Sequence, residues 1–474
     1  MRAESSRSLL AGLEIGYTDK AVTGWGGLVL VAEFFRRIGL RGLLERALPD
    51  GRTSPNQRSV VDIAMSLMVN VLTGGERFAH VERLRYDLAL RKMFEIDVIP
   101  SAATLTRYFG GFVRRQSERL AELLDRYVVN QLKSPEGGEV LDLDSTVLAR
   151  CGEQEGSKKG YNPRRPGRPS HHPLLAMLAH SKTILHVWLC SGDANPIAGC
   201  VAFLGEALAK LSDSFVIAKV RADSGFFSEA FLSELEKRGL LYAVAVRVRP
   251  DIQRLIRAVT EWTPSQDGRR EFGEFILQPS PRRKARRLIA VRQPIRAGRT
   301  TPGKRLFLLP DYVYHVLVTN MDLKPEQVLE FYNGRADCEN RIKELKYDFA
   351  AGGFCLQSFF GTEATFRLIC FLFNLMAILS DQLLGNPARR LSTARAQVFV
   401  AGAILGQHGR QPPLRLGLSG RPRERFKALS DKLKLSVLST ASQLIESLKN
   451  HLLEPSTPWK LRTRSRSLVV VGAY

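Results

Sequence analysis

The stretch Val140-Leu141-Asp142-Leu143-Asp144 carries two carboxylates in an otherwise apolar run. The pattern predicts a strand over residues 139–147, with both aspartates projecting from the same face. Burying an unpaired charge is costly, and a divalent cation is one of the few partners that offsets the cost. The alternative is that an Asp at the end of the strand caps the turn at Ser145-Thr146.

A second carboxylate, Asp223, follows the apolar run Phe215–Ala222, which predicts another strand. Carboxylates at the strand ends of one α/β sheet can converge on a common site. Taken alone, Asp223 can instead cap the helix that we expect over residues 228–238.

The third candidate is Glu339, in a predicted helix that covers residues 331–346. At about 100° per residue, one stripe of roughly 60° holds four polar side chains. These are Tyr332, Arg335, Glu339 and Lys346. The same projection puts Asp337, Glu344 and Asp348 on the solvent side. Gly334 is a helix breaker that can shift Tyr332 out of register, and an i,i+4 ion pair between Arg335 and Glu339 on a solvated face is the alternative to a catalytic role.

The spacing Tyr332-x2-Arg335-x3-Glu339-x6-Lys346 resembles the Tyr-Arg-Glu-Lys signature of bacterial insertion-sequence transposases of the DDE class, in the retroviral-integrase superfamily. The Asp-Ser-Thr at 144–146, the Asp-Ser-Gly at 223–225 and the Gly/Pro-rich run at 160–173 are also similar to that class. The resemblance covers roughly residues 138–380.

The resemblance implies an α/β fold: an RNase H-like catalytic domain with a mixed sheet, interrupted by an insertion domain between the second and third acids. We therefore expect a helical N-terminal domain that binds DNA ends (residues 1–135), a catalytic domain (residues 138–385, insertion at about 249–310) and a basic, partly helical C-terminal segment (residues 386–474). Strands are expected over 139–147, 174–180, 184–190, 215–222, 241–248 and 312–319.

The same resemblance implies that Asp144, Asp223 and Glu339 form the catalytic acid triad and bind the metal. Two Mg²⁺ ions about 3.5–4 Å apart activate the nucleophile and stabilise the leaving oxygen in such chemistry, and oxygen ligands without His or Cys suit Mg²⁺ or a substituting Mn²⁺. Arg335 and Lys346 would neutralise phosphates, Tyr332 would hydrogen-bond to or stack on the strand, and Asp142 is an alternative ligand.

The function implied is that of a transposase that binds terminal inverted repeats, cleaves double-stranded DNA at element ends and transfers the 3′-hydroxyls to target DNA. Its partners would be those two DNAs and a second copy of the chain in a synaptic homodimer. Two alternatives are a non-catalytic DNA-binding protein with the same fold, and an RNase H-like nuclease without strand transfer.

Composition agrees with a DNA partner. The 474 residues carry 70 Lys+Arg against 47 Asp+Glu, a net charge of +23. Such an excess attracts polyanions, of which nucleic acids are the commonest, although an anionic membrane surface stays an alternative. The length of 474 residues predicts two or three domains, and a hydrophobic content of 44% is enough for a packed core, which argues against a disordered basic protein.

Two acid-free basic stretches are candidates for a DNA track. The first, Ser157–His172, is expected to be a loop, and its candidate DNA contacts are Lys158, Lys159, Tyr161, Arg164, Arg165 and Arg168. The second, Pro281–Arg305, carries ten basic residues within the proposed insertion. A solvated basic surface is the alternative for each.

Several features concern the rest of the chain. Ser101 is the expected N-cap of a helix that buries Leu105, Phe109 and Phe112 and that either reads DNA or simply packs. Further helices are expected around residues 80–94 and over 423–453.

The dispersed cysteines predict reduced thiols, and the N-terminus lacks a signal peptide. The apolar run 368–380 is shorter than the ~20 residues that cross a bilayer, so we expect a buried helix, no membrane partner and a bacterial cytoplasmic, nucleoid-associated protein.

Overall fold

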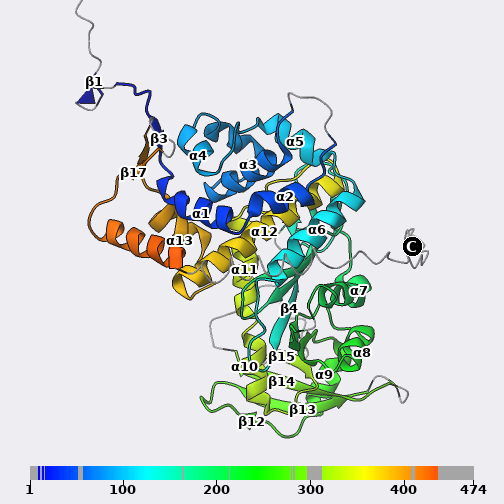
Figure 1. Ribbon diagram of the computed structural model, residues 1–474. Helices are drawn as coiled ribbons and strands as arrows, with labels where there is room; N and C mark the ends of the chain where they lie inside the picture. The colour runs from blue at the N-terminus through cyan, green and yellow to red at the C-terminus, as the bar shows by residue number, and fades with distance from the viewer. Residues whose placement is uncertain are drawn as a thin grey trace, which may run out of the picture.

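The computed structural model shows a helical part joined to a part that is built around one large sheet (Figure 1). The structure describes residues 9–10, 13–14, 16–51, 57–162, 165–212, 214–278, 280, 283–295, 312–406 and 412–435.

The first 130 residues form most of the helical part, as expected from their apolar periodicity. The helices are α1 (Val29–Arg37), α2 (Leu40–Ala47), α3 (Val60–Leu72), α4 (Leu88–Met93), α5 (Ala102–Gly110) and α6 (Arg114–Val129), with 3₁₀ segments at Gly26–Leu28 and Phe78–Leu84. The helical segment expected around 80–94 is present, but it is divided into the 3₁₀ segment Phe78–Leu84 and helix α4. Asp87 accepts a hydrogen bond from Leu90 N (2.8 Å) and starts α4 as a separate helix.

Helix α5 agrees with its sequence pattern. The Ser101 side chain accepts a hydrogen bond from Thr104 N at 3.3 Å, which is the expected N-cap. Leu105, Phe109 and Phe112 are buried in the helical core. The apolar face of α5 therefore packs in the protein core, and a role of this helix in reading DNA stays a prediction.

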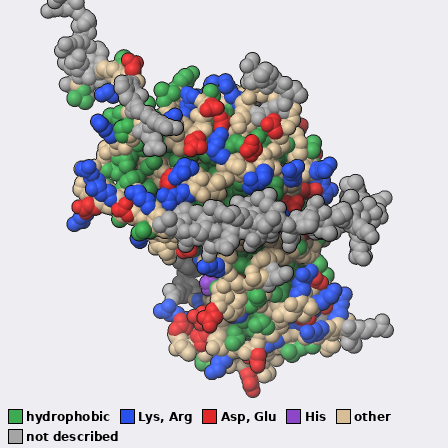
Figure 2. Space-filling view, viewed as in Figure 1, with side chains coloured by type: hydrophobic (Ala, Val, Ile, Leu, Met, Phe, Trp, Pro, Cys, Tyr) green, Lys and Arg blue, Asp and Glu red, His purple; other side chains and the backbone are tan. Residues whose placement is uncertain are grey.

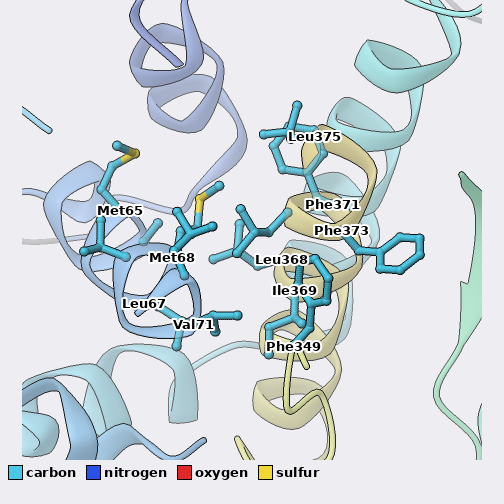
Figure 3. Packing of buried hydrophobic residues seen from close by; sticks show 14 of the residues in the cluster. Met65, Leu67, Met68, Val71, Phe349, Leu368, Ile369, Phe371, Phe373 and Leu375 are labelled. Atoms are coloured by element: carbon cyan, nitrogen blue, oxygen red, sulfur yellow. The ribbon is translucent and has the colours of Figure 1, made fainter. Parts of the chain in front are cut away.

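Helix α12 (Phe359–Leu384) is the centre of this part. It packs against α3, α5 and α6, and against strand β9 (Ile184–Trp188) of the sheet. Figure 3 shows Leu368 and Ile369 of α12 next to Met68 and Val71 of α3, with Phe349 below them. The N-terminal helices therefore share one hydrophobic core with a helix that lies far downstream in the sequence.

Among the described residues, α12 is the one helix that is long and apolar enough to cross a membrane by length and composition. Of its most apolar window, however, 72% is buried inside the protein. The helix also carries a buried ion pair between Glu363 and Arg367 (2.9 Å), and Ser117 Oγ donates to Glu363 at 2.8 Å. These contacts agree with the buried core helix expected from residues 368–380, although α12 extends to 26 residues.

Nine strands form one mixed sheet in the order β12-β13-β14-β15-β11-β10-β4-β8-β9. The strands are β4 (Glu139–Ser145), β8 (Leu174–Leu178), β9, β10 (Ile217–Ala222), β11 (Leu241–Val246), β12 (Thr263–Pro264), β13 (Glu271–Leu277), β14 (Arg286–Pro294) and β15 (Tyr312–Thr319). Strands β4, β10 and β11 are parallel neighbours, whereas β8, β9 and β15 run antiparallel to the strands beside them. The six expected strands are confirmed within a few residues.

Helices cover both faces of the sheet (Figure 1). Helices α7 (Pro196–Leu208), α8 (Glu229–Lys237) and α9 (Pro250–Arg257) pack on the face to which Leu141 and Leu143 of β4 point. Helix α10 (Pro325–Asn333) packs on the opposite face over β11, β14 and β15, and α11 (Ala336–Tyr347) follows it into the helical part. Since side chains alternate along a strand, Asp142 and Asp144 face the α10–α11 side.

The expected insertion, at about 249–310, has regular structure in its described portion. It contains α9 and the strands β12, β13 and β14, which extend the sheet through the pairing of β14 with β15. Their basic side chains also have partners. Arg286 pairs with Glu229 (2.6 Å) and Glu236 (2.9 Å), and Arg287 pairs with Glu274 (2.6 Å).

Two further ion pairs involve residues of the second basic stretch. Arg292 pairs with Glu271 and stacks between Trp262 and Tyr312, with ring centroids 4.0 and 4.6 Å away. Lys284 pairs with Glu236 at 3.2 Å. Lys284, Arg286, Arg287 and Arg292 are thus engaged in ion pairs within the protein, and the DNA track stays a prediction. Arg283 is exposed, and Arg282, Arg296, Arg299, Lys304 and Arg305 lie outside the described part.

Residues after 386 pack back onto the helical part. They include α13 (Leu391–Ala394), a π-helical turn (Arg395–Phe399) and strands β16 (Ala403–Leu405) and β17 (Leu414–Leu416), which form a small sheet with β3 (Ala21–Thr23). Residues 420–435 are helical, which agrees with the start of the helix expected over 423–453, and its remainder lies outside the described residues. Near the N-terminus β1 (Leu9–Leu10) pairs with β2 (Leu13–Glu14). All six cysteines are free, as expected.

Candidate active site

Two of the predicted acids meet where parallel strands β4 and β10 end. Leu143 of β4 is paired with Ala222 of β10, so the next residues along the two strands, Asp144 and Asp223, adjoin at the same edge of the sheet. Asp144 is buried, and its Oδ1 accepts a hydrogen bond from Ser145 N at 2.7 Å. Asp223 is half-buried, and its Oδ1 accepts from Gly225 N at 2.9 Å. Asp223 therefore shapes its own turn, whereas Ser228 is the N-cap of α8.

Asp142 points to the same face but has a separate partner. It lies opposite Arg221 in the β4–β10 pairing, and Arg221 Nε and Nη2 donate to its two carboxylate oxygens at 2.6 and 2.8 Å. Both side chains are buried. Because a bidentate guanidinium already compensates its charge, Asp142 is not available as the substitute metal ligand that the sequence left open.

Arg221 also fixes the junction between α10 and α11. Its Nη1 donates to Phe331 O at 2.9 Å, and its guanidinium lies 5.3 Å from the Phe331 ring centroid. A Cβ on Gly334 would come within 2.1 Å of Arg221 Nη1, so only glycine leaves room for this contact. The helix expected over 331–346 is consequently two helices, with Gly334 and Arg335 between them.

Arg335 connects two of the predicted acids across this junction. Its Nη2 lies 2.8 Å from Asp144 Oδ1, and its Nη1 lies 2.8 Å from Glu339 Oε1. The Arg335 side chain is 7% exposed, whereas that of Glu339 is 51% exposed. The i,i+4 pair that the sequence offered as the alternative is present, but its arginine is buried beside the Asp144 carboxylate and does not lie on a solvated face.

The charges of Asp144, Asp223, Glu339 and Arg335 influence one another. Burial raises the pKa of Asp144 to about 7, the Arg335 charge opposes this, and the charges of Asp223 and Glu339 raise the pKa further. Burial also raises the pKa of Tyr332, which faces the same three acids. A concentrated negative charge of this kind requires a cation, and Arg335 supplies one.

The donor chemistry of Asp144, Asp223 and Glu339 suits a hard divalent metal, because all three side chains offer carboxylate oxygens. Within the described residues, however, no group of three or more His, Cys, Asp or Glu side chains is arranged to hold a metal ion. The guanidinium of Arg335 lies between Asp144 and Glu339 and keeps those carboxylates apart.

A cavity of about 630 Å³ opens beside Asp223. Its walls come from the β4 exit, the first basic stretch and the end of α11, and they include Asp223, Thr146, Tyr161, Arg165, His172 and Lys346. Lys346 Nζ donates to Thr146 Oγ1 (3.2 Å) and to Val147 O (2.8 Å), so this lysine ties α11 to the segment that follows Asp144.

Comparison with known proteins identifies the family. The family model described as "Transposase DDE domain group 1" matches residues 12–454. This chain belongs to that family. It is therefore a transposase by class, with DNA as its partner and DNA transposition as its reaction.

Two further comparisons add context. The cryo-EM structure of a piggyBac transposase synaptic complex with hairpin DNA is 12% identical in sequence, with a TM-score of 0.43. That similarity covers 94% of this chain and 90% of the piggyBac chain. No curated protein is similar enough to this chain to count as a match.

The first basic stretch of the transposase is not a plain loop, which corrects the expectation for 157–172. Strands β6 (Lys158–Lys159) and β7 (Pro169–His171) form a small sheet with β5 (Leu148–Ala149). Lys158 and Lys159 are exposed, and Lys158 Nζ lies 3.3 Å from Asp193.

The other candidates in this stretch divide into two groups. Tyr161 and Arg165 line the cavity, and their contact with DNA stays a prediction. Arg168 instead donates to Arg150 O at 3.1 Å and to Cys151 Sγ, so it holds the stretch itself together. Arg164 lies outside the described residues.

The two adjacent histidines have different surroundings. His171 is fully buried, accepts from Arg150 Nε at 2.8 Å through Nδ1 and contacts Glu155 O at 2.9 Å through Nε2. Burial lowers its pKa to about 4, so it is a neutral structural residue. His172 lies in the cavity wall with Asp223; burial lowers its pKa, and the Asp223 charge opposes that shift.

Sequence reasoning missed one contributor to this site, Arg221. Arg221 precedes Asp223 by two residues, as Asp142 precedes Asp144, and this parallel spacing was a usable signal for their pairing. The adjacent histidines His171 and His172 suggest a DNA-contacting or structural role from the sequence, but the position of His172 beside Asp223 in the cavity wall depends on the fold. Glu344, expected on the solvent side, is buried and accepts from Leu391 N at 2.8 Å.

Proposed function

We propose that this chain is the transposase of a bacterial insertion sequence, which binds the terminal inverted repeats, cleaves at the element ends and joins the 3′-hydroxyls to target DNA. The observation that carries the proposal is the meeting of Asp144 and Asp223 at one edge of the sheet, with Glu339 joined to Asp144 through Arg335. The Tyr332, Arg335, Glu339 and Lys346 spacing of the sequence supports the same class.

The fold proposed for the catalytic domain is RNase H-like. The segment β9-β8-β4-β10-β11 supports it, with three parallel strands on one side and two antiparallel strands on the other. In this proposal β12, β13 and β14 belong to an insertion between Asp223 and Glu339 that continues the sheet instead of forming a separate body.

Asp144, Asp223 and Glu339 would hold two Mg²⁺ ions, or Mn²⁺ in their place, with Asp144 between the other two acids. When bound, such ions make the water or 3′-hydroxyl a better nucleophile and stabilise the leaving oxygen of the broken P–O bond. Burial of Asp144 and the turn at Asp223 keep these oxygens fixed before DNA arrives, which lowers the reorganisation that the reaction requires.

The cavity side chains would hold the scissile strand. Arg165 and Lys346 neutralise its phosphates, and Tyr161 offers its ring and hydroxyl to sugars and bases. Tyr332 lies outside this cavity, but it faces the same three acids and would contact the strand from there. Lys346 also keeps Thr146 and Val147 in place, so its contribution includes positioning Asp144. We propose that the protein acts as a homodimer on the bacterial nucleoid and that residues 1–135 contribute DNA-end recognition.

The decisive experiment is excision in vitro from a plasmid that carries the native gene with its flanks, in Mg²⁺ or in EDTA. We expect discrete Mg²⁺-dependent breaks at the element ends and joined products with target DNA. Glu339→Gln should bind the same DNA and not cleave it, since it loses a ligand without losing a basic residue. The matched control is Asp337→Asn on the same helix, whose partner is Lys182 (2.7 Å) away from the acids.

The possible results separate the candidate functions. Breaks without joined products would favour the nuclease, and binding without breaks in the wild type would favour the non-catalytic protein. Cleavage that persists in Glu339→Gln would overturn the assignment of the third acid.

A further inference from the structure

Arg335 occupies the position between two carboxylates that a metal ion would need. One guanidinium nitrogen lies 2.8 Å from Asp144 Oδ1, and another lies 2.8 Å from Glu339 Oε1. The Asp144 oxygen also accepts the Ser145 N–H. These two carboxylate oxygens are therefore already engaged by donors.

A divalent cation and this guanidinium cannot occupy the same place. Mg²⁺ and Mn²⁺ need carboxylate oxygens at short distances, about 2.0–2.1 Å for Mg²⁺, and two positive charges in one buried pocket repel each other strongly. The finding that the described residues contain no preformed cluster of three metal-ligating side chains agrees with this competition.

The surroundings of Arg335 indicate what could remove it. Among the described residues its buried Nε finds no hydrogen-bond partner, so the guanidinium is only partly satisfied. Arg335 is also the N-cap residue of α11, just after the Gly334 break, and the helix beyond it does not depend on where its side chain points. A phosphate offers a planar guanidinium two parallel hydrogen bonds and a full negative charge.

We propose that Arg335 is an internal counter-ion that closes the metal site of the free protein and is drawn away by a phosphate of the bound strand. DNA binding then frees Asp144 and Glu339 for the divalent cation, so DNA and metal bind cooperatively. By linkage the metal strengthens DNA binding by the same factor. This inference rests on the proposed function, since it takes Asp144 and Glu339 as the metal ligands.

The test is Mn²⁺ binding, measured by electron paramagnetic resonance of free Mn²⁺, with and without a duplex that carries the native element end. Without DNA, Arg335→Gln should bind Mn²⁺ about 10-fold or more tightly than wild type. Adding the duplex should tighten Mn²⁺ binding to wild type and change the variant little. Arg335→Lys keeps the positive charge but lacks the planar guanidinium, so its Mn²⁺ affinity should lie between those of wild type and Arg335→Gln. This conservative variant also controls for a folding defect.

Two controls locate the effect. Lys343→Gln, at an exposed position on α11, removes one positive charge elsewhere and should leave Mn²⁺ affinity near wild type. Asp144→Asn in the Arg335→Gln background should abolish the gained Mn²⁺ binding.

The failures can be told apart. If wild type and Arg335→Gln bind Mn²⁺ equally without DNA, and Asp144→Asn abolishes that binding, the metal site stands and the counter-ion role is wrong. If none of the proteins binds Mn²⁺ at Asp144 even with DNA, the metal assignment of the proposed function fails, and this inference fails with it.

Discussion

Asp142 and Arg221 are paired residues on neighbouring parallel strands, and they form a buried bidentate ion pair at 2.6 and 2.8 Å. The same guanidinium donates to Phe331 O at the end of α10. The pair therefore anchors the helix junction that carries Tyr332, Arg335 and Glu339 to the centre of the sheet. Its role is to position these residues rather than to contact DNA.

The first prediction concerns this anchor. Arg221→Met leaves Asp142 buried and unpaired, and the free energy of unfolding should fall by about 3–5 kcal/mol in urea denaturation. The double variant Asp142→Leu/Arg221→Met should regain most of that stability, because no uncompensated charge remains. It still lacks the hydrogen bond to Phe331, so DNA cleavage should stay reduced. Wild-type cleavage in the stable double variant would refute the positioning role.

The second prediction concerns Gly334. A Cβ there would lie 2.1 Å from Arg221 Nη1, and the bond to Asp142 prevents that guanidinium from moving away. Gly334→Ala should therefore lower both the melting temperature and the cleavage rate, although alanine normally favours helices. Gly110→Ala in α5, where nothing lies within 4 Å of the added Cβ, is the control and should be neutral or stabilising by up to about 1 kcal/mol. Equal effects of the two substitutions would contradict this explanation.

The third prediction concerns pH. His171 has a folded-state pKa of about 4, below its ordinary value of 6.5, so between these values the unfolded chain binds a proton that the folded protein does not. Stability should therefore fall as the pH drops from about 6.5 towards 4. His171→Gln can keep a donor and an acceptor for Glu155 and Arg150 but does not titrate, so it should flatten this dependence in urea denaturation at several pH values. His180→Gln, at a position with a 64% exposed side chain, is the comparison.

The fourth prediction concerns the cavity wall. If Arg165 neutralises one phosphate, Arg165→Gln should reduce the slope of log K against log salt by about 1 for DNA binding. Arg126→Gln on α6, whose residues do not line the cavity, should leave the slope unchanged. An unchanged slope in Arg165→Gln, measured by fluorescence anisotropy over a salt series, would remove Arg165 from the DNA track.

The sequence was most informative where chemistry and local periodicity agree. The strand that carries Asp144 and the strand before Asp223 follow from apolar runs, and Glu339 follows from its spacing to Tyr332 and Lys346. The assumption of one continuous helix was wrong, because Gly334 accommodates a side chain from β10 that lies more than a hundred residues earlier in the sequence.

The sequence could not show which residues form ion pairs across long distances in the chain. From the sequence Arg286 is part of a basic stretch, whereas in the structure it pairs with Glu229 and Glu236. From the sequence Arg335 can form a surface ion pair with Glu339, whereas in the structure it also pairs with Asp144. A sequence does not show which acidic residues will lie beside a basic stretch in the folded protein. The number of basic residues in such a stretch therefore overestimates the unpaired positive charge on the surface. Figure 2 shows Lys and Arg distributed over both parts of the visible face rather than gathered in one patch.

The burial of α12 against α3 also determines when this protein can fold during synthesis. About 290 residues separate the end of α3 at Leu72 from the start of α12 at Phe359, and at 5–20 residues per second the ribosome needs about 15–60 s to make them. Throughout that time Met68 and Val71 lack the partners seen in Figure 3. The nascent chain must keep an apolar surface exposed until most of the protein has been translated, which makes it a natural client for ribosome-associated chaperones.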